Sequence, residues 1–300
     1  MRTKKQTNIL NRVKKSIPGW LLILPALVLV YFLIVRPQVL SIYYSFCEMK
    51  GFKVTGFAGF DNYIRVISDS LFLKLLWNTL QYVLWSLIIG YFIPIILAVM
   101  LNEMVHFRQG FRVITYLPAA LPGVAVMMLW YFMYSPDVSG LFNTLFVKLG
   151  MEPFGWLQEP AWVIPLIVVS MTWHSAGVTT MYYFAALQGV NRELYEASLI
   201  DGAGFIKRIR TVAFPHISKI SLLFLVRQII SVFSIMEQPL QMTDGGPNNA
   251  SMSLGLQTYK YAFIQNKPQL SMALSVIMFL ILCIATVFYF KMDKKLSENE

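Results

Sequence analysis

The segment GVNRELYEASLIDGAGFIKRIRTVAFP, residues 189–215, is a polar stretch between two long apolar runs. Asn191 is a favourable N-cap for the helix that follows, because its side chain can accept a hydrogen bond from a free backbone N–H. Glu193 and Glu196 lie in the first turns of that helix, where the positive end of the helix dipole stabilises carboxylates. We expect the helix to continue to about Asp201 and to end at the glycines beyond it, which supply the necessary backbone freedom.

A second short helix is expected to begin near Phe205, after Gly202 and Gly204. Its apolar residues are spaced for one helix face and its basic residues lie off that face. The apolar set is Phe205, Ile209 and Val212, and the basic set is Lys207, Arg208 and Arg210. Pro215 is expected to close the unit, since proline cannot donate a backbone hydrogen bond. Residues 189–215 therefore predict two short helices joined by a glycine elbow, a compact knob suited to meet another protein.

The same segment resembles the EAA loop of ABC importer permeases. In that family the loop inserts into a cleft of the ATP-hydrolysing subunit and couples closure of that subunit to the membrane helices. The resemblance implies a coupling role for the matching residues, which are Glu196, Ala197, Asp201, Gly202, Ala203, Gly204 and Pro215. The alternative is an ordinary amphipathic loop on the cytoplasmic side of a membrane protein.

The composition predicts a membrane protein. The chain is 57% hydrophobic and 13% charged, whereas a soluble domain has about a quarter charged residues. The net charge of +10 does not indicate nucleic-acid binding, because the basic residues are placed as membrane topology signals. Cys47 and Cys283 have no metal-ligating neighbours and are poor disulfide partners, so we expect no metal and no cofactor.

Six apolar runs are long enough to cross a bilayer, which requires about 20 largely apolar residues. They are Ile17–Val35, Leu75–Leu101, Val113–Tyr134, Ala161–Leu187, Ile220–Met236 and Leu270–Phe290. The first is preceded by a basic tail, residues 1–16, and is followed by Arg36-Pro37 rather than by a small-residue cleavage site, so we expect a retained span and not a signal peptide. The predicted fold is an all-α membrane protein with six transmembrane helices.

The distribution of lysine and arginine predicts the orientation. With the N-terminus inside, the cytoplasmic segments carry about twice as many of these residues as the exterior segments. Both termini, including a tail at 291–300, and the knob are then cytoplasmic. This orientation agrees with the resemblance although it does not depend on it.

Further motifs resemble carbohydrate-uptake ABC permeases of the maltose-transporter type. They are Gly59-Phe60-Asp61-Asn62-Tyr63 in the exterior loop, Leu76-Trp77-Asn78-Thr79-Leu80 at the start of the second span, Thr243-Asp244-Gly245-Gly246-Pro247 with Ser251, and Tyr259-Lys260-Tyr261-Ala262-Phe263. The resemblance implies a type I ABC importer permease fold, with residues 17–74 forming the first helix and exterior loop and residues 75–290 forming the transmembrane type-1 domain. It also implies a multi-pass protein of a bacterial or archaeal inner membrane.

Polar residues within the apolar runs suggest a substrate path. Pro118 and Pro122 interrupt the third span and predict a kink there, which serves either a substrate path or packing. Trp173 could stack on a sugar ring and His174 could bind a hydroxyl, although a histidine in a helix bundle more often serves packing. Arg227 lies seven residues into the fifth span. Placing an arginine side chain in hydrocarbon costs about 2.5 kcal/mol or more of insertion free energy, so Arg227 should face a partner or a cavity.

The resemblance places the substrate path on the third, fourth and fifth spans. The matching positions are Ala119 and Gly123, then Met171, His174, Ser175 and Val178, then Ser231, Val232 and Ile235; Trp173 and Arg227 are added from their chemistry. Several of these residues are small or apolar, which favours a wide path or a site borne mainly by a partner permease. Trp156 and Trp162, in the exterior loop before the fourth span, are expected to anchor the membrane interface.

The motifs that are missing also constrain the function. The sequence contains no Walker loop for ATP and no arrangement typical of a hydrolase, so we expect a transport subunit and not an enzyme. The predicted partners are a second homologous permease, two ATP-binding cassette subunits, an extracytoplasmic solute-binding protein, a sugar or oligosaccharide, and membrane lipid. Two alternatives stay open. One is an ABC permease for glycerol phosphate or another non-sugar solute, and the other is a secondary transporter, against which the lack of carboxylates in the apolar runs speaks.

Overall fold

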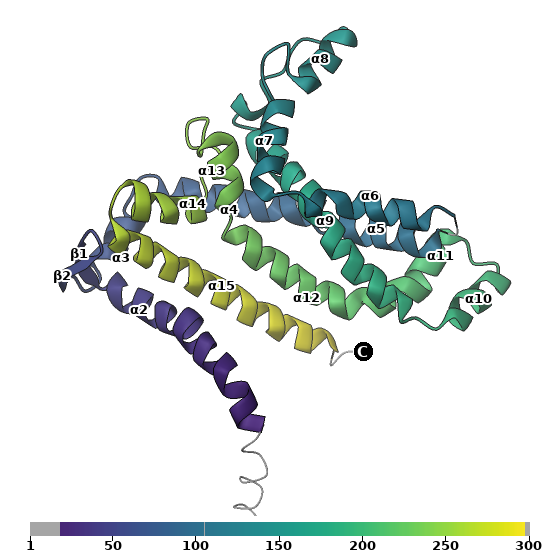
Figure 1. The fold of residues 1–300 in the computed structure, drawn as a ribbon, viewed down its shortest axis with the longest axis horizontal. Helices are drawn as coiled ribbons and strands as arrows, with labels where there is room; N and C mark the ends of the chain where they lie inside the picture. Colours follow the sequence, from purple (N-terminus) through teal and green to yellow (C-terminus); the bar gives the residue numbers. More distant parts are fainter. Residues whose placement is uncertain (1–18, 105, 298–300) are drawn as a thin grey trace, which may run out of the picture.

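The computed structural model describes residues 19–104 and 106–297, which form an elongated bundle of helices with one small hairpin (Figure 1). The first helix, Gly19–Ser45, includes η1 (Tyr31–Val35) and α2 (Arg36–Ser45). The elements that follow are β1 (Cys47–Lys50), β2 (Lys53–Phe57), α3 (Asp61–Ile67), α4 (Phe72–Trp85), η2 (Ser86–Gly90), α5 (Phe92–Glu103), α6 (Arg108–Ala120), α7 (Gly123–Met133), α8 (Leu141–Lys148), η3 (Trp156–Gln158), α9 (Val163–Gln188), α10 (Arg192–Ile200), α11 (Phe205–Arg208), η4 (Ile209–Ala213), α12 (Phe214–Phe233), α13 (Glu237–Thr243), α14 (Leu254–Tyr259), η5 (Lys260–Ile264) and α15 (Pro268–Ser297).

Four helices of the described chain are long and apolar enough to cross a membrane: Gly19–Ser45, Phe72–Glu103, Val163–Gln188 and Pro268–Val287. Two bent helix pairs raise the number to six if each pair is one span. These pairs coincide with the third and fifth runs expected from the sequence. The helical fold is therefore as predicted, while the exact number of spans remains a prediction.

The first helix is longer than the sequence indicated, because Pro37 does not end it. A π turn, η1, precedes the proline, and the Arg36 N–H bonds the Tyr31 carbonyl five residues back. The wider turn relieves the clash that the proline ring would make with a carbonyl of a regular α-turn. The expected exterior loop therefore begins only after Ser45.

A two-stranded antiparallel hairpin, β1–β2, follows the first helix and is an exception to the all-α prediction. Lys50 pairs with Lys53, which leaves Gly51 and Phe52 as a two-residue turn. Gly51 has φ +58°, a conformation that favours glycine. The Gly59–Tyr63 motif holds this loop against the first helix, since the Asn62 amide donates 2.9 Å hydrogen bonds to the carbonyls of Ser45 and Cys47.

The third predicted span is broken rather than kinked. Helices α6 and α7 meet at 96°, and the break falls where Leu121 is extended, just before Pro122. Proline disfavours the helical conformation of the residue before it, which accounts for the position of the break. Pro118 is accommodated inside the end of α6. As a result α7 projects away from α5 and α6, with α8 beyond it (Figure 1).

The loop beyond α7 is organised around Asn143, which is fully buried. Its amide donates to the carbonyls of Pro136 and Phe154, and its oxygen accepts from the Phe154 N–H and from the Trp156 indole at 2.8 Å. Trp156 also packs on Phe142 and Phe146. This places Trp156 in a local aromatic core, contrary to its expected role as an interfacial anchor, whereas Trp162 is 53% exposed.

Two family-like motifs, which lie far apart in the sequence, bind each other. The Asn78 amide donates to the carbonyls of Asn249 and Met252, at 2.8 and 2.9 Å, and the Thr79 hydroxyl accepts from the Leu254 N–H. Tyr82, which is fully buried, donates to the Ser251 carbonyl. The start of the second span thus fixes the Thr243–Ser251 loop.

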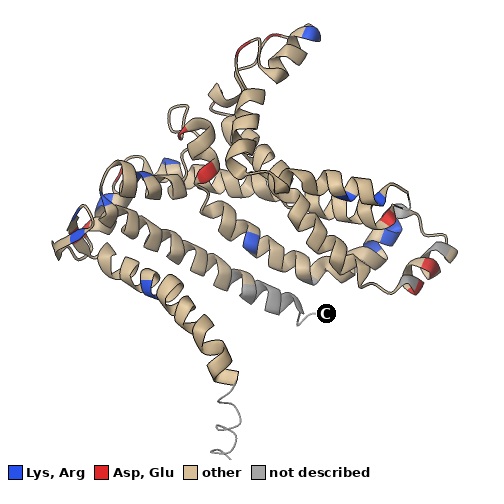
Figure 2. Ribbon diagram, in the orientation of Figure 1, with Lys and Arg blue, Asp and Glu red and all other residues tan. Residues whose placement is uncertain are grey.

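Charged residues gather toward the two ends of the long axis (Figure 2). The hairpin and α3 lie at one end, and α10 and α11 lie at the other (Figure 1). The helices between them are largely uncharged, as expected for segments in hydrocarbon.

Candidate functional site

The knob, residues 189–215, begins with the capped helix that the sequence predicts. The Asn191 side-chain oxygen accepts a 3.1 Å hydrogen bond from the Glu193 N–H, and its amide donates to the Glu193 carboxylate. Helix α10 then runs from Arg192 to Ile200. The prediction for this helix is confirmed at both ends.

The elbow of the knob is formed at Gly202, which has φ +68°. The Asp201 N–H bonds the Ala197 carbonyl and the Ala203 N–H bonds the Ser198 carbonyl, both at 2.9 Å, so the last turn of α10 is closed. Ala203 is buried, while Ala197, Asp201 and Gly202 are exposed. A Cβ at Gly202 or Gly204 would meet nothing within 4 Å. Gly202 is therefore needed for its conformation and not for space.

Polar contacts attach the base of the knob to the end of α5. Arg208 forms a 2.6 Å ion pair with Glu103 and also donates to the Ala203 carbonyl. Both side chains of the pair are largely buried, at 16% and 21% exposed. The Asn102 amide donates to the Tyr195 hydroxyl, and Gln188 donates to Asn102. Burial, with a further effect of the Glu103 carboxylate, raises the pKa of Tyr195 and keeps it a neutral acceptor.

An apolar cluster beneath these polar contacts joins the knob to the bundle. Ala213 and Ile217 are buried against Ala98, Tyr183 and Leu187 of α5 and α9, with Ile209 and Val212 packed alongside. Ile209 and Val212, two of the three residues in the apolar stripe predicted for the second helix, therefore face the bundle. The side chain of the third, Phe205, is outside the described part of the structure. The knob is therefore anchored on one face.

The opposite face of the knob presents apolar side chains to the outside. Ile200 is 87% exposed, Ile206 is 79% exposed and Leu194 is 51% exposed. Ile200 and Ile206 lie on either side of the exposed Asp201-Gly202 elbow in the sequence, and Leu194 lies earlier in α10. An exposed apolar patch on an anchored, rigid element is typical of a protein-binding surface.

Pro215 does not close the knob, contrary to the sequence prediction. The chain continues from α11 through the π turn η4 into α12, and Pro215 lies in the first turn of α12. The Phe214 N–H bonds the Ile209 carbonyl, five residues back. The wider turn accommodates the proline as it does before Pro37, so the knob is continuous with α12.

A polar groove between α9 and α12, about 190 Å³ in volume, collects part of the predicted substrate path. We call it the α9–α12 groove. The predicted residues that line it are Met171, His174, Ser175, Arg227, Ser231 and Val232. The other lining residues are Gly90, Tyr91, Thr179, Tyr183, Phe224, Gln228 and Gln238.

The remaining predicted path residues lie apart from this groove. Trp173 packs edge-on against Trp130, at 5.8 Å between ring centroids. Ile235 is buried in an apolar cluster of the bundle. Ala119 and Val178 are half-buried in α6 and α9 and do not line the groove. Gly123 is near it, since a Cβ there would lie 3.8 Å from the His174 ring.

His174 also contacts the break between α6 and α7. Its Nε2 lies 3.3 Å from the Leu121 carbonyl, one of the groups that the break leaves without a helical partner. This contact explains why a histidine lies in the helix bundle, and no bound substrate is needed for that explanation. A substrate contact of His174 stays a prediction.

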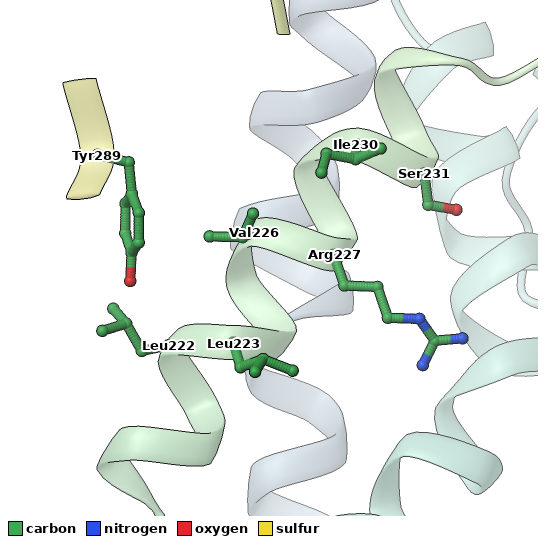
Figure 3. Close-up of a pocket in the computed structure, with 7 residues that line it drawn as sticks. All are labelled: Leu222, Leu223, Val226, Arg227, Ile230, Ser231 and Tyr289. Carbon is green, nitrogen blue, oxygen red and sulfur yellow. The ribbon is translucent and has the colours of Figure 1, made fainter. Parts of the chain in front are cut away.

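Arg227 is exposed on α12 and borders two hollows. One is the α9–α12 groove, and the other is an apolar hollow of about 520 Å³ that Leu222, Val226 and Tyr289 also line. Figure 3 shows the guanidinium pointing away from Tyr289, on the same side of α12 as the Ser231 hydroxyl. The charged group therefore belongs to the polar groove.

Sequence reasoning missed the contribution of the second span to this groove. The π turn η2, Ser86–Gly90, interrupts that span beside the groove, and Tyr91 follows it. A Cβ at Gly90 would lie 3.0 Å from the Gln228 amide and 3.1 Å from the Thr172 hydroxyl, so the second span approaches α9 and α12 closely there. A glycine inside a long apolar run marks close approach and is the signal that was available. Gln228, next to Arg227 in the sequence, is a polar residue inside an apolar run, which also indicates a contact within the bundle.

Comparison with known proteins identifies the family. Residues 90–298 match the model of the "Binding-protein-dependent transport system inner membrane component" family. The chain belongs to this family. It is a multi-pass inner membrane component of an ABC transporter, as predicted, and its resemblance to carbohydrate-uptake permeases is confirmed by its relatives.

The relatives match along almost their whole length. The lactose transport system permease LacF of Rhizobium radiobacter is 30% identical over 93% of this chain and 96% of its own. A probable ABC transporter permease of Pyrococcus horikoshii is 32% identical over 93% of this chain and 96% of its own. The trehalose/maltose permease MalF of Thermococcus litoralis is 28% identical over 92% and 93%.

A solved structure has the same fold. A chain of a bacterial alginate ABC transporter, in complex with an alginate pentasaccharide-bound periplasmic protein, superimposes with a TM-score of 0.84 at 22% identity, covering 95% of this chain and 97% of that chain. The fold is therefore that of an ABC importer permease.

Proposed function

We propose that this chain is the membrane-spanning permease subunit of an ATP-driven importer for a sugar or oligosaccharide. An extracytoplasmic binding protein delivers the solute, and a second homologous permease completes the pathway. Two copies of an ATP-binding cassette subunit hydrolyse ATP, so this subunit is not itself an enzyme. Both termini lie in the cytoplasm, and the chain crosses the membrane six times.

The observation that carries this proposal is the knob, an anchored helix pair with an exposed apolar face. The Arg208–Glu103 ion pair and the cluster around Ile217 hold one face, while Ile200 and Ile206 project from the other. Closure of the ATP-binding subunits would move the knob as a rigid body. Helices α11, η4 and α12 follow one another without a loop, with a 63° bend between Ser218 and Ile220, so this motion would pass through the bend to the part of α12 that lines the α9–α12 groove.

The substrate class rests on the relatives, whose names include lactose, trehalose and maltose as transported sugars. The polar lining of the α9–α12 groove, with Ser175, Ser231 and Gln228, suits a hydroxyl-rich solute. The sugar would pass between the two permeases beside this groove.

The experiment that tests the assignment is purification of the tagged chain in mild detergent from its native host, followed by mass spectrometry. We expect an ATPase with a Walker loop and a second permease to be recovered. Recovery of this chain alone at good yield would contradict the proposal and favour a self-sufficient transporter.

The coupling role predicts the effect of a substitution at the elbow. Gly202→Asp strains the positive-φ elbow and adds a charge between Ile200 and Ile206, so we expect normal membrane insertion but loss of ATP-dependent uptake. Gly110→Asp, at an exposed glycine of α6, serves as control. Normal uptake in the Gly202 variant would contradict coupling through the knob.

Glycerol phosphate is a second candidate solute, because Arg227 offers a cation to an anionic group. It predicts that phosphate esters inhibit uptake and that Arg227→Ala abolishes it. Competition by neutral sugars alone would reject this candidate. A secondary transporter finds less support, since α4, α6, α7, α9 and α12 contain no Asp or Glu.

A further inference from the structure

Arg227 is a charge without a counter-charge. Arg208–Glu103 and Lys260–Asp244 are ion pairs between described residues, and neither involves Arg227. The residues that line the α9–α12 groove include no carboxylate. A cation at this depth of an apolar helix is expensive and is retained when it serves a function.

The side chain is poorly placed to escape to the membrane surface. Arg227 is the fourteenth residue of α12, so the nearer end of the helix is the Phe233 end. Side chains on a helix lean toward its N-terminus, which is here the more distant end. Figure 3 shows the guanidinium pointing away from Tyr289, on the side of α12 where Ser231 lies, although Arg227 also lines the edge of the apolar hollow.

The polar groups that share the α9–α12 groove with Arg227 are neutral. Gln228 and Ser231 flank Arg227 on α12, and Ser175 and His174 face the groove from α9. Gln228 is held beside Gly90, where its amide fills the space that a side chain would take. These groups can bind hydroxyls, and the fork of the guanidinium matches the two oxygens of a carboxylate.

We infer that Arg227 recognises an anionic group on the transported saccharide, so that the importer carries an acidic sugar such as a uronate oligosaccharide. The inference rests on the proposed function and deepens it by naming the substrate class. The sugar hydroxyls bind the neutral groups of the groove while the carboxylate binds Arg227.

The test uses the complete importer, purified with its partner subunits and binding protein and reconstituted in proteoliposomes with ATP inside. The outside mixture holds neutral malto- and cello-oligosaccharides, galacturonate and glucuronate oligosaccharides, and glycerol 3-phosphate at equal concentration. Mass spectrometry of the vesicle contents reports what is imported. We expect the uronate oligosaccharides to accumulate.

Variants then test the role of the charge. We expect Arg227→Gln to lower uronate uptake about tenfold or more, the loss expected for one charge-assisted contact. Arg227→Lys should retain part of the activity, because it keeps the charge but not the fork. Arg36→Gln, an exposed arginine of α2 away from the groove, should transport as the unaltered protein does.

The remaining outcomes overturn the inference in distinguishable ways. Import of neutral saccharides that Arg227→Gln leaves unchanged rejects the anionic substrate but keeps the sugar importer. An equal loss of neutral and acidic uptake means that Arg227 pairs with a carboxylate of the second permease. Import of glycerol 3-phosphate alone, or of no saccharide while ATP hydrolysis continues, rejects the saccharide function itself.

Discussion

Single buried polar side chains hold this protein together at places where the backbone is irregular. Asn78 donates to the Asn249 carbonyl of the Thr243–Ser251 loop and to the Met252 carbonyl just after it, and Asn143 donates to carbonyls of the loop beyond α7. In each case one side chain satisfies backbone carbonyls that in a helix or sheet would be satisfied by backbone N–H groups. The sequence marks these residues only as polar positions, because their partners lie far away along the chain.

We predict that Asn78→Leu destabilises the protein by about 2 kcal/mol or more, since it leaves buried carbonyls without a donor. The residue is 4% exposed, and leucine is similar in size, so no large cavity confounds the result. The apparent midpoint of thermal unfolding in detergent measures the effect. Gln109→Leu, on the exposed face of α6, is the matched control and should change little.

Gly177 lets α9 approach α6 closely. A Cβ at this position would overlap the Thr115 carbonyl and lie 2.9 Å from the Tyr116 Cα. We expect Gly177→Ala to cost about 1–3 kcal/mol, because the two helices must move apart. Gly110→Ala, where nothing lies within 4 Å, should be neutral or slightly stabilising. Equal melting temperatures for the two variants would refute the close approach.

At the scale of elements, two departures from the sequence analysis share one physical source. Pro215 was expected to close the knob and the first apolar run was expected to end before Pro37, yet a π turn precedes each proline and absorbs the missing hydrogen bond. The tendency of proline to break a helix depends on local geometry. A wider π turn, stabilised by tertiary packing, can accommodate the proline and let the helix continue. At Pro122 no such turn precedes the proline, and the helix breaks by 96°.

The ion pair between α5 and the knob gives a prediction about coupling. We expect Glu103→Arg to leave ATP hydrolysis active but to lower the number of solutes imported per ATP, because the knob loses its attachment to the bundle. The double variant Glu103→Arg with Arg208→Glu should restore coupling by reversing the pair. Simultaneous measurement of uptake and phosphate release in proteoliposomes tests both; failure of the double variant to recover would argue against an electrostatic link.

For the whole molecule, the charge pattern predicts which end faces the cytoplasm. In a variant with Cys47 and Cys283 replaced by serine, we introduce a single cysteine by Lys53→Cys in the hairpin or by Gln109→Cys in α6, both exposed. A membrane-impermeant maleimide should label the hairpin position in intact cells and the α6 position only after permeabilisation. Labelling of Gln109→Cys in intact cells would reverse the proposed topology.

Much of the architecture follows from the sequence, because hydrophobic run length and helix capping are local. The capped helix at Asn191 and the elbow at Gly202 are cases in which the prediction succeeded. The α9–α12 groove could be predicted only in part, since Gly90 and Tyr91 reach it through an unforeseen π turn. The aromatic core around Trp156 required a tertiary partner, Asn143, that no local pattern reveals.

The contact between Asn78 and Asn249 spans 171 residues, and this separation has a consequence for biogenesis. At 5–20 residues per second, the ribosome needs roughly 10–30 s to deliver the second residue after the first. During this interval the polar start of the second span is already at the membrane without the loop that will satisfy it. Until the loop is made, the Asn78 amide must find other hydrogen-bond acceptors, such as water or lipid headgroups at the membrane surface.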